Sequence, residues 1–253
     1  MLRLYNSFVA IQSHGERPME TGIILLVAAG LIAMDTTSGP QFLISEPVVT
    51  CAVLGVLFHR PEFGLWLGIL FQLLWLGYLP LGAARLSDGN MAAFIATASL
   101  FLAQKLFAID TVSLKAAVIP ALFFGIAVGA IGLHLTQLSR KMNGKRNDVL
   151  RSRLAAGTDV SPARTHCIGI GSSFLRGVIM ALVLVPVETV LLGCIRFLSA
   201  QMATIMSTAS LLIWGTVSAS AVLFFWRSER RRYFVLGSLG GIVWILFLTF
   251  QKS

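Results

Sequence analysis

Long apolar stretches alternate with short polar segments along this chain of 253 residues. A helix that crosses the hydrocarbon core of a bilayer, which is about 30 Å thick, needs about 20 consecutive apolar residues. Four stretches reach that length, at about 90–109, 112–138, 168–198 and 203–226, and a fifth at 233–250 is near the limit. The pattern therefore predicts spanning helices over the second half of the chain.

The first third of the chain has shorter apolar segments. Gly22–Met34 and Pro47–Phe58 are each too short to cross a bilayer upright at about 1.5 Å per residue. The polar segment between them contains Gly39 and Pro40, residue types that interrupt helices. We expect residues 22–59 to form a broken, re-entrant helical hairpin whose polar tip lies inside the membrane. Two short tilted spans with an external loop are the alternative.

The hairpin is followed by a run of helices that we place at residues 64–138. Gly64, Gly68 and Gly77 recur along the first of them, a spacing that lets neighbouring helices approach closely. Pro80 then ends that helix. The sequence thus predicts close helix packing directly after the hairpin.

Composition strengthens the membrane interpretation. Hydrophobic residues make up 56% of the chain and charged residues 12%, whereas a soluble domain carries about 25% charged residues. We therefore predict an all-α integral membrane protein, a polytopic helical bundle formed by a single domain over residues 19–253. Residues 1–18 match neither a signal peptide nor a spanning helix. We expect them to be a disordered tail or an extension that precedes a native start at Met19.

Basic residues cluster beside the apolar stretches. Lys and Arg number 20 against 11 Asp and Glu, and the positive-inside rule places basic segments on the cytoplasmic side. This predicts a basic cytoplasmic loop at 139–166 and a second cytoplasmic segment at 227–232, joined by the two spans at 168–198 and 203–226. Helices thus make up most of residues 168–250. No aromatic-rich polar platform accompanies the charge, so we expect no nucleic-acid partner.

The basic loop is also a candidate docking surface for an acidic soluble protein or for anionic lipid. A purely topogenic role is the alternative. The candidate docking residues are Arg140, Lys141, Lys145, Arg146, Arg151 and Arg153.

Polar side chains at membrane depth are costly and mark candidate sites. They gather in the same part of the chain as the interrupted helices. A sugar presents hydroxyl groups that donate and accept hydrogen bonds, so carboxylates and carboxamides suit it. The candidate substrate-binding residues are Asp35, Gln41, Gln72, Asp88 and Asn90, with Glu46 and Trp75 as secondary candidates.

Two further charged residues lie at membrane depth near the end of a long apolar stretch. For Glu188 and Arg196 we expect ion pairs with other helices, or an Arg196 side chain that reaches the outer interface. The sequence contains no nucleotide-binding, metal-ligand or nucleophile motif. We therefore expect no cofactor, no metal and no enzyme active site.

The segment from Gly22 to about Ala98 resembles the IIC membrane subunit of the mannose/sorbose-type phosphotransferase system. A weaker likeness covers about 115–185. The matching residues are Asp35, Gln41, Pro47, Gly55, Gly64, Gly68 and the block from Gln72 to Asp88, followed by Ile119-Pro120 and a Ser-Ser-Phe-Leu run after His166.

This resemblance implies a permease subunit in the bacterial inner membrane. It implies that the chain binds and translocates a hexose or related sugar together with a IID membrane subunit, in a homo-oligomeric complex. Cytoplasmic IIA and IIB proteins would carry the phosphoryl group and phosphorylate the sugar as it enters.

The chain departs from the family pattern at several positions. The family's Glu is Gln72 here, and its Arg-Pro is Glu46-Pro47. Its Gly-Asp is His59-Arg60, and the Pro before Asp88 is Ser87. These departures leave two interpretations open: a permease with a changed substrate, or a regulatory or scaffold membrane protein derived from such a permease that no longer transports.

Overall fold

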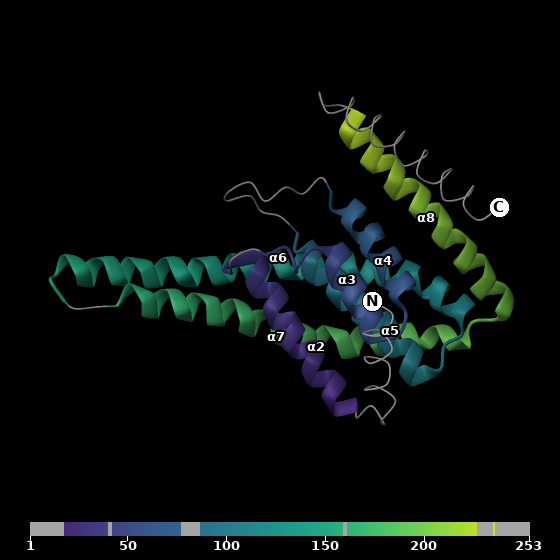
Figure 1. Ribbon diagram of the computed structural model, residues 1–253, viewed down its shortest axis with the longest axis horizontal. Coiled ribbons are helices and arrows are strands. Elements are labelled where there is room, and N and C mark those ends of the chain that lie inside the picture. Colours follow the sequence, from purple (N-terminus) through teal and green to yellow (C-terminus); the bar gives the residue numbers. More distant parts are fainter. Residues whose placement is uncertain (1–17, 40–41, 77–86, 159–160, 227–234, 236–253) are drawn as a thin grey trace, which may run out of the picture.

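The computed structural model describes residues 18–39, 42–76, 87–158, 161–226 and 235, and the regular structure within these ranges is entirely helical. Figure 1 shows the arrangement of the helices. In chain order they are α2 (Pro18–Thr37), α3 (Pro47–Leu57), α4 (Pro61–Leu74), α5 (Gly89–Phe107), α6 (Thr111–Ala155), α7 (Pro162–Gly193), the short 3-10 helix η1 (Cys194–Phe197) and α8 (Ala200–Trp226). The predicted all-helical class is confirmed.

Five helical segments are long and apolar enough to cross a membrane. They are Met19–Thr37, Gly89–Phe107, Thr111–Ala155, Pro162–Phe197 and Ala200–Val222. The last four coincide with the four predicted spans, so the chain is a multi-pass membrane protein. The predicted span at 233–250 lies outside the described residues apart from Val235, and so does the predicted cytoplasmic segment 227–232. The expected extension at residues 1–18 lies outside them too, apart from Pro18, the first residue of α2.

The first helix is longer than the sequence pattern predicts. We expected a half-length helix at Gly22–Met34, but α2 has 20 residues and continues to Thr37. The hydroxyl groups of Thr36 and Thr37 donate to the Ile32 and Ala33 carbonyl oxygens at 2.8 and 2.9 Å. These hydrogen bonds pair the two hydroxyl groups within the last turn of α2, so polar residues are accommodated where polarity alone suggested the end of the helix. The expected 22–59 hairpin of two half-length helices is therefore wrong in its first half.

The short apolar helices of the structure are α3 and α4. They have 11 and 14 residues, or about 17 and 21 Å at 1.5 Å per residue. Each begins with a proline, whose missing N–H costs nothing at a helix start. A tight turn at His59, which has a φ of 57°, joins them, and they pack against each other.

Glycines bring the backbones of α3 and α4 together. A Cβ placed on Gly55 would lie 2.9 Å from Gly64 Cα and 2.7 Å from the Arg60 carbonyl oxygen. A Cβ placed on Gly68 would lie 2.8 Å from Val48 Cα. The prediction that Gly64 and Gly68 permit close approach of a neighbouring helix is confirmed, and α3 is that neighbour.

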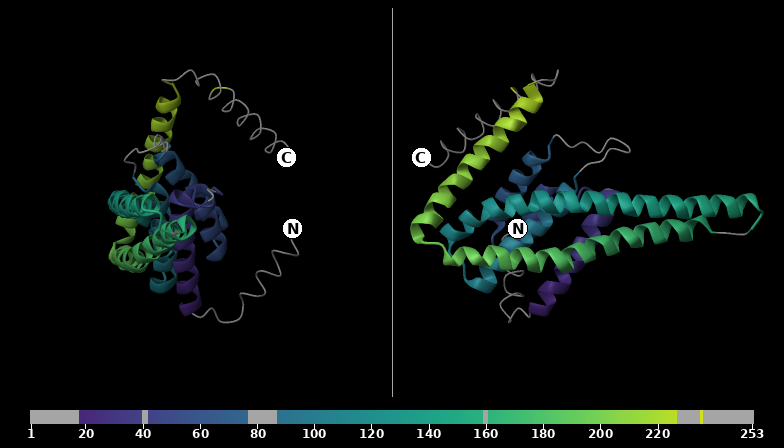
Figure 2. Two further views of the ribbon diagram at one scale, coloured as in Figure 1. Left: turned by 90° about the vertical axis from the view of Figure 1, so that its left-hand side faces the viewer. Right: turned by 180° about the vertical axis from the view of Figure 1, so that it is seen from behind.

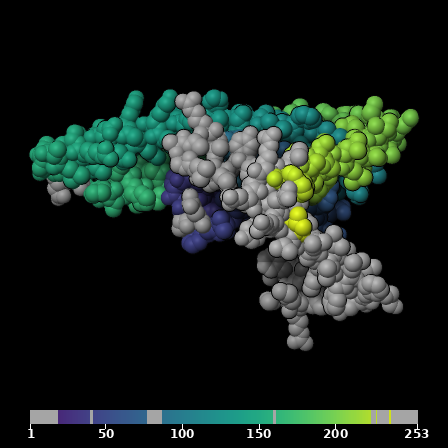
Figure 3. Space-filling view, turned by 90° about the horizontal axis from the view of Figure 1, so that it is seen from above, coloured from purple at the N-terminus to yellow at the C-terminus, as the bar shows by residue number. Residues whose placement is uncertain are grey.

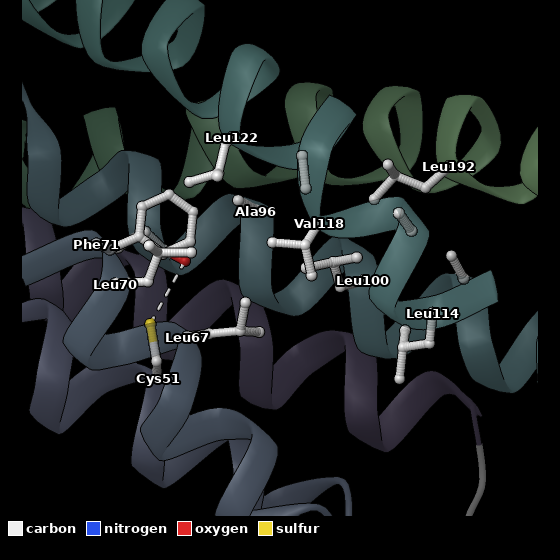
Figure 4. Close-up of a cluster of buried hydrophobic side chains, with 14 of the residues drawn as sticks. Cys51, Leu67, Leu70, Phe71, Ala96, Leu100, Leu114, Val118, Leu122 and Leu192 are labelled. Carbon is white, nitrogen blue, oxygen red and sulfur yellow. Dashed lines mark hydrogen bonds between the residues drawn. The ribbon is translucent and has the colours of Figure 1, made fainter. Parts of the chain in front are cut away.

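Helix α5 lies at the centre of the bundle. It contacts α2, α3, α4, α6 and α7, and every residue from Met91 to Phe101 is buried. A helix that is buried on all sides is typical of the middle of a bundle. Figure 4 shows one side of this core, where Leu67 of α4, Ala96 of α5 and Val118 of α6 meet. Cys51 of α3 joins them, with its thiol 3.7 Å from the Ala93 carbonyl oxygen.

Helices α6 and α7 extend together well beyond the other helices (Figures 1 and 2). We call residues 139–155 of α6 and 162–168 of α7 the α6–α7 arm, and Figure 3 shows it leaving the body of the molecule. The 139–166 segment is thus mostly helical rather than a loop. It contains no proline before Pro162, and α6 ends only where Gly157 adopts a φ of 71°. Ser161 then caps α7 by accepting the Arg164 N–H at 3.4 Å.

Helix α8 leans away from the bundle (Figure 2). The 3-10 helix η1 turns the chain into it from α7. Helix α8 contacts α6 and α4. The ring centroids of Trp66 and Trp214 lie 5.1 Å apart where α4 and α8 meet. Most of its other large side chains, such as Leu211 and Leu212, are exposed in the single chain.

The close contact of α3 with α4 gives a first prediction. We expect Gly64→Ala to destabilise the protein by about 1–3 kcal/mol, because the new methyl group meets backbone atoms that cannot move aside. Gly144→Ala is the control, since a Cβ there has nothing within 4 Å, and it should leave stability unchanged or slightly raised. Thermal unfolding of the two variants in detergent tests this. Equal melting temperatures would contradict the close approach.

Candidate functional site: a polar cluster at the end of α2

The segment that follows α2 folds around the carboxylate of Asp35. Asp35 is 2% exposed, and its two oxygens accept the N–H groups of Phe42 at 2.6 Å and Ser45 at 3.1 Å. A carboxylate near the C-terminal end of a helix faces unfavourable partial negative charge. The two backbone N–H groups offset that cost and fix the path of the chain from α2 to α3.

Asn90, in the first turn of α5, joins this segment from the side. Its Nδ2 donates to Ser45 Oγ at 3.2 Å and lies 3.5 Å from Thr36 Oγ1. Its side chain therefore connects α5 with both the end of α2 and the segment before α3. Asn90 is half-buried, so part of its amide remains accessible.

Glu46 and Gln72 form the neighbouring pair. Gln72 Nε2 donates to Glu46 Oε2 at 2.9 Å, and Gln72 Oε1 lies 3.5 Å from the Val48 N–H. Glu46 precedes the first residue of α3, where the helix dipole favours a negative charge. Because Glu46 follows Ser45 directly, the Glu46–Gln72 and Asn90–Ser45 hydrogen bonds are adjacent.

Asp88 lies deeper, at the start of α5. It caps α5 by accepting the Met91 N–H at 3.2 Å, and its Oδ2 lies 3.8 Å from Arg176 Nη2 of α7. Helix α6 comes close enough for a Cβ on Gly132 to lie 3.1 Å from Asp88 Oδ2. Both charged side chains are buried. They form an ion pair inside the bundle.

Arg176 of α7 links its own helix to three others. Besides Asp88 of α5, its guanidinium group donates to Thr136 Oγ1 of α6 and, at 3.3 Å, to the Ala33 carbonyl oxygen of α2. Our sequence reasoning did not single it out. The signal was present, because Arg176 is the one ionisable residue in the apolar stretch from Cys167 to Val187.

Hydroxyl groups add a second link between α2 and α7. Ser173 Oγ lies 2.6 Å from Ser38 Oγ and 3.2 Å from Thr37 Oγ1. These residues also escaped the sequence analysis, because single Ser and Thr residues in apolar helices are common and carry no spacing signal. With Arg176, they hold the end of α2 against α7.

The structure thus brings together most of the predicted site residues. Asp35 and Asn90 meet at Ser45, and Gln72 meets the secondary candidate Glu46. We call these residues the polar cluster: Asp35, Thr36, Ser45, Glu46, Gln72 and Asn90. Gln41 lies outside the described residues.

Two other candidates have packing roles. Asp88 forms the buried ion pair with Arg176 that is described above. Trp75 stacks on Phe71 at a centroid distance of 5.7 Å and fills the space beside Gly89, where a Cβ would lie 2.7 Å from its ring. Trp75 therefore supports the first turn of α5 from α4.

Glu188 and Arg196 lie elsewhere in the bundle. The guanidinium carbon of Arg196 in η1 is 5.2 and 4.6 Å from the ring centroids of Phe107 and Phe197, a cation–π arrangement. The expected ion pair of Arg196 is not found among the described residues. Glu188 is fully buried in α7, and its carboxylate oxygens have no hydrogen-bond partner among the described residues. The expected ion pair for Glu188 is therefore not found within the described part of the chain.

The polar cluster contains groups that can donate hydrogen bonds to hydroxyl groups and accept hydrogen bonds from them. Carboxylate, amide and hydroxyl groups converge there, and Glu46, Gln72 and Asn90 are half-buried rather than sealed. Such groups bind polyols by accepting and donating hydrogen bonds. No group of three or more His, Cys, Asp or Glu side chains suited to a metal ion occurs among the described residues.

Comparison with known proteins gives a family match and five similar chains among solved structures, two of which are described below. The family described as "PTS system sorbose-specific IIC component" matches residues 20–239. A structure described as a membrane protein has a TM-score of 0.64 and 16% identity, covering 92% of this chain and 97% of that one. A cryo-EM structure of the mannose transporter ManYZ with a microcin has a TM-score of 0.56 and 16% identity, covering 94% and 97%. These two show a shared fold, and no curated protein matches significantly.

The buried ion pair gives a second prediction. We expect Asp88→Asn to lower stability by about 3–5 kcal/mol, because Arg176 is left buried without a counter-charge. Adding Arg176→Gln should recover part of the loss. The measurement is a double-mutant cycle by unfolding in detergent.

Asp110 provides the matched control for this cycle. It caps α6 from an exposed position, where hydrogen bonds from Ser113 and Val112 hold the pKa of its carboxyl below the usual value. Asp110→Asn makes the same chemical change at a helix cap without a buried cation, so we expect little effect. A loss as large as that of Asp88→Asn would argue against the ion pair as the cause.

Proposed function

The chain belongs to the sorbose-specific IIC component family of the phosphotransferase system, and we propose that it binds and translocates a hexose or related sugar. IIC chains of this family are transport subunits. The observation that carries the proposal is the polar cluster, in which donors and acceptors from α2, α4, α5 and the segment before α3 converge.

Within the polar cluster, we assign different roles to different residues. Asp35 has both oxygens occupied by backbone N–H groups, so it positions the segment between α2 and α3. Glu46 has one oxygen bonded to Gln72, which leaves the other for a sugar hydroxyl. Asn90 and Gln72 are the remaining groups that we propose to contact the sugar.

The proposed partners follow from the family. We propose that the chain works with a IID membrane subunit in an oligomeric complex in the bacterial inner membrane. The similar fold of a chain from the ManYZ mannose transporter supports this assembly. We propose that phosphoryl transfer takes place on cytoplasmic IIA and IIB proteins, as the family implies; the polar cluster itself contains no histidine.

The two departures from the family pattern at Glu46 and Gln72 support continued transport. Both positions change, and the two side chains bond to each other. Hydrogen-bonding groups are therefore still present at both changed positions, as a sugar site requires. We therefore favour a permease with altered recognition over the non-transporting scaffold.

Sugar uptake tests the proposed site. In cells that make this chain with its IIA, IIB and IID partners, we expect Asn90→Ala and Gln72→Ala each to reduce uptake about tenfold or more, since each removes a hydrogen bond of roughly 1.5 kcal/mol from a partly desolvated site. The control is Thr208→Ala on the exposed face of α8, which should keep full uptake. Unchanged uptake in both cluster variants at normal expression would refute the site.

The Glu46–Gln72 contact allows a sharper test. Gln72→Glu alone places two carboxylates at hydrogen-bond distance, and like charges at that distance repel. We expect this single variant to lose uptake and the double variant Glu46→Arg/Gln72→Glu to recover it, because opposite charges are restored. A double variant no better than the single one would contradict the coupling. Absence of uptake in the unaltered chain with all partners present would favour the scaffold interpretation.

A further inference from the structure

The α6–α7 arm carries a large share of the positive charge of the protein. Residues 139–166 contain seven basic and two acidic residues. The positive-inside rule accounts for basic residues on this side of the membrane. It does not require that they be carried on a rigid pair of helices, which is how the structure presents them (Figure 2).

The arm projects into water. The apolar part of α6, at about 112–138, is about 40 Å long at 1.5 Å per residue, already longer than the hydrocarbon core. Because α6 is one continuous helix to Ala155, its last 17 residues add about 25 Å along the same direction. Most of the arm therefore lies beyond the depth of lipid headgroups, which occupy only about 5–8 Å on each side.

A hollow lies between the two helices of the arm. Its volume is about 680 Å³, and four cations line it: Lys145, Arg146 and Arg153 of α6 and Arg164 of α7. Apolar groups, Val149 among them, line it as well. We call this feature the arm hollow. Half of the docking residues predicted from the sequence line it, whereas Arg140, Lys141 and Arg151 do not.

The cations of the arm hollow are available to a partner. Lys145, Arg153 and Arg164 are exposed, and within the described residues none of the four hollow cations has an ion-pair partner. Arg146 bonds only the neutral Asn143, at 3.2 Å. Val149 is 52% exposed. Arginine beside exposed apolar groups is the composition of a protein-binding surface.

We propose that the arm hollow docks an acidic surface patch of the cytoplasmic phosphocarrier protein, of IIB type, that serves this permease. This inference rests on the proposed function. Charge complementarity favours an acidic partner, and the distance of the arm hollow from the bilayer favours a soluble protein over an anionic lipid. Docking at this distance holds the phosphocarrier beside the cytoplasmic ends of α6 and α7.

The test measures binding of the purified IIB protein from the same organism to the full chain in nanodiscs of neutral phosphatidylcholine. We expect Lys145→Glu/Arg153→Glu to weaken binding about tenfold or more, with Lys145→Gln/Arg153→Gln intermediate. The matched control is Arg140→Glu/Arg151→Glu, which changes net charge equally outside the arm hollow and should keep most of the affinity. Raising salt from about 50 to about 300 mM should weaken wild-type binding.

Each other outcome overturns the proposal. Equal losses in the hollow and control pairs would indicate non-specific attraction to the net charge. Unchanged binding in the hollow pairs would place the docking surface elsewhere. Binding seen only in nanodiscs of anionic phosphatidylglycerol would assign the arm hollow to lipid.

Sugar uptake by the unaltered chain separates this proposal from the proposed function. Uptake with no IIB binding to the arm refutes the docking and leaves the transport function intact. Docking at the arm hollow without any uptake supports the docking and refutes the transport function.

Discussion

The structure depends on one constraint: a polar group at membrane depth must find its hydrogen-bond partner within the protein, because lipid supplies none. Arg176 shows how the bundle meets it. Its guanidinium group bonds or pairs with side chains or carbonyls of α2, α5 and α6. A charge that would be expelled from a lone helix thus becomes a link between four helices. The polar cluster adjoins that link, because Asn90 follows Asp88 by two residues and Asp35 follows Ala33 by two.

The same constraint shapes the short helices. Helices α3 and α4, with 11 and 14 residues, turn back on each other at His59, and their glycines let the two backbones approach closely. Their polar ends then face Asn90 and the end of α2. Close packing of small residues and satisfaction of polar groups therefore combine to place Glu46 beside Gln72.

Sequence reasoning found the spans because apolar length is a strong signal, and it found Asp35, Gln72 and Asn90 because amides and carboxylates are rare at membrane depth. It failed where a polar segment did not mark the end of a helix. Helix α2 runs past its apolar segment to Thr37, and the hydroxyl groups of Thr36 and Thr37 bond to carbonyl oxygens of the same helix. The arm was predicted to be a loop because its low hydropathy indicates exposure to water. Exposure does not end a helix, and α6 continues until the chain turns at Gly157. Arg176 needed a tertiary structure to reveal its three partners.

The continuity of α6 and α7 through the membrane has a mechanical consequence. Arg176 and the tip of the arm belong to the same unbroken helix, separated by about 20 Å. Such a helix pair can act as a lever, with its pivot at Ser173 and Arg176, which hold the end of α2. A tilt of about 10° at the pivot moves the tip by about 4 Å. A tilt of α7 at one end would therefore move its other end, because no break in the helix separates the two.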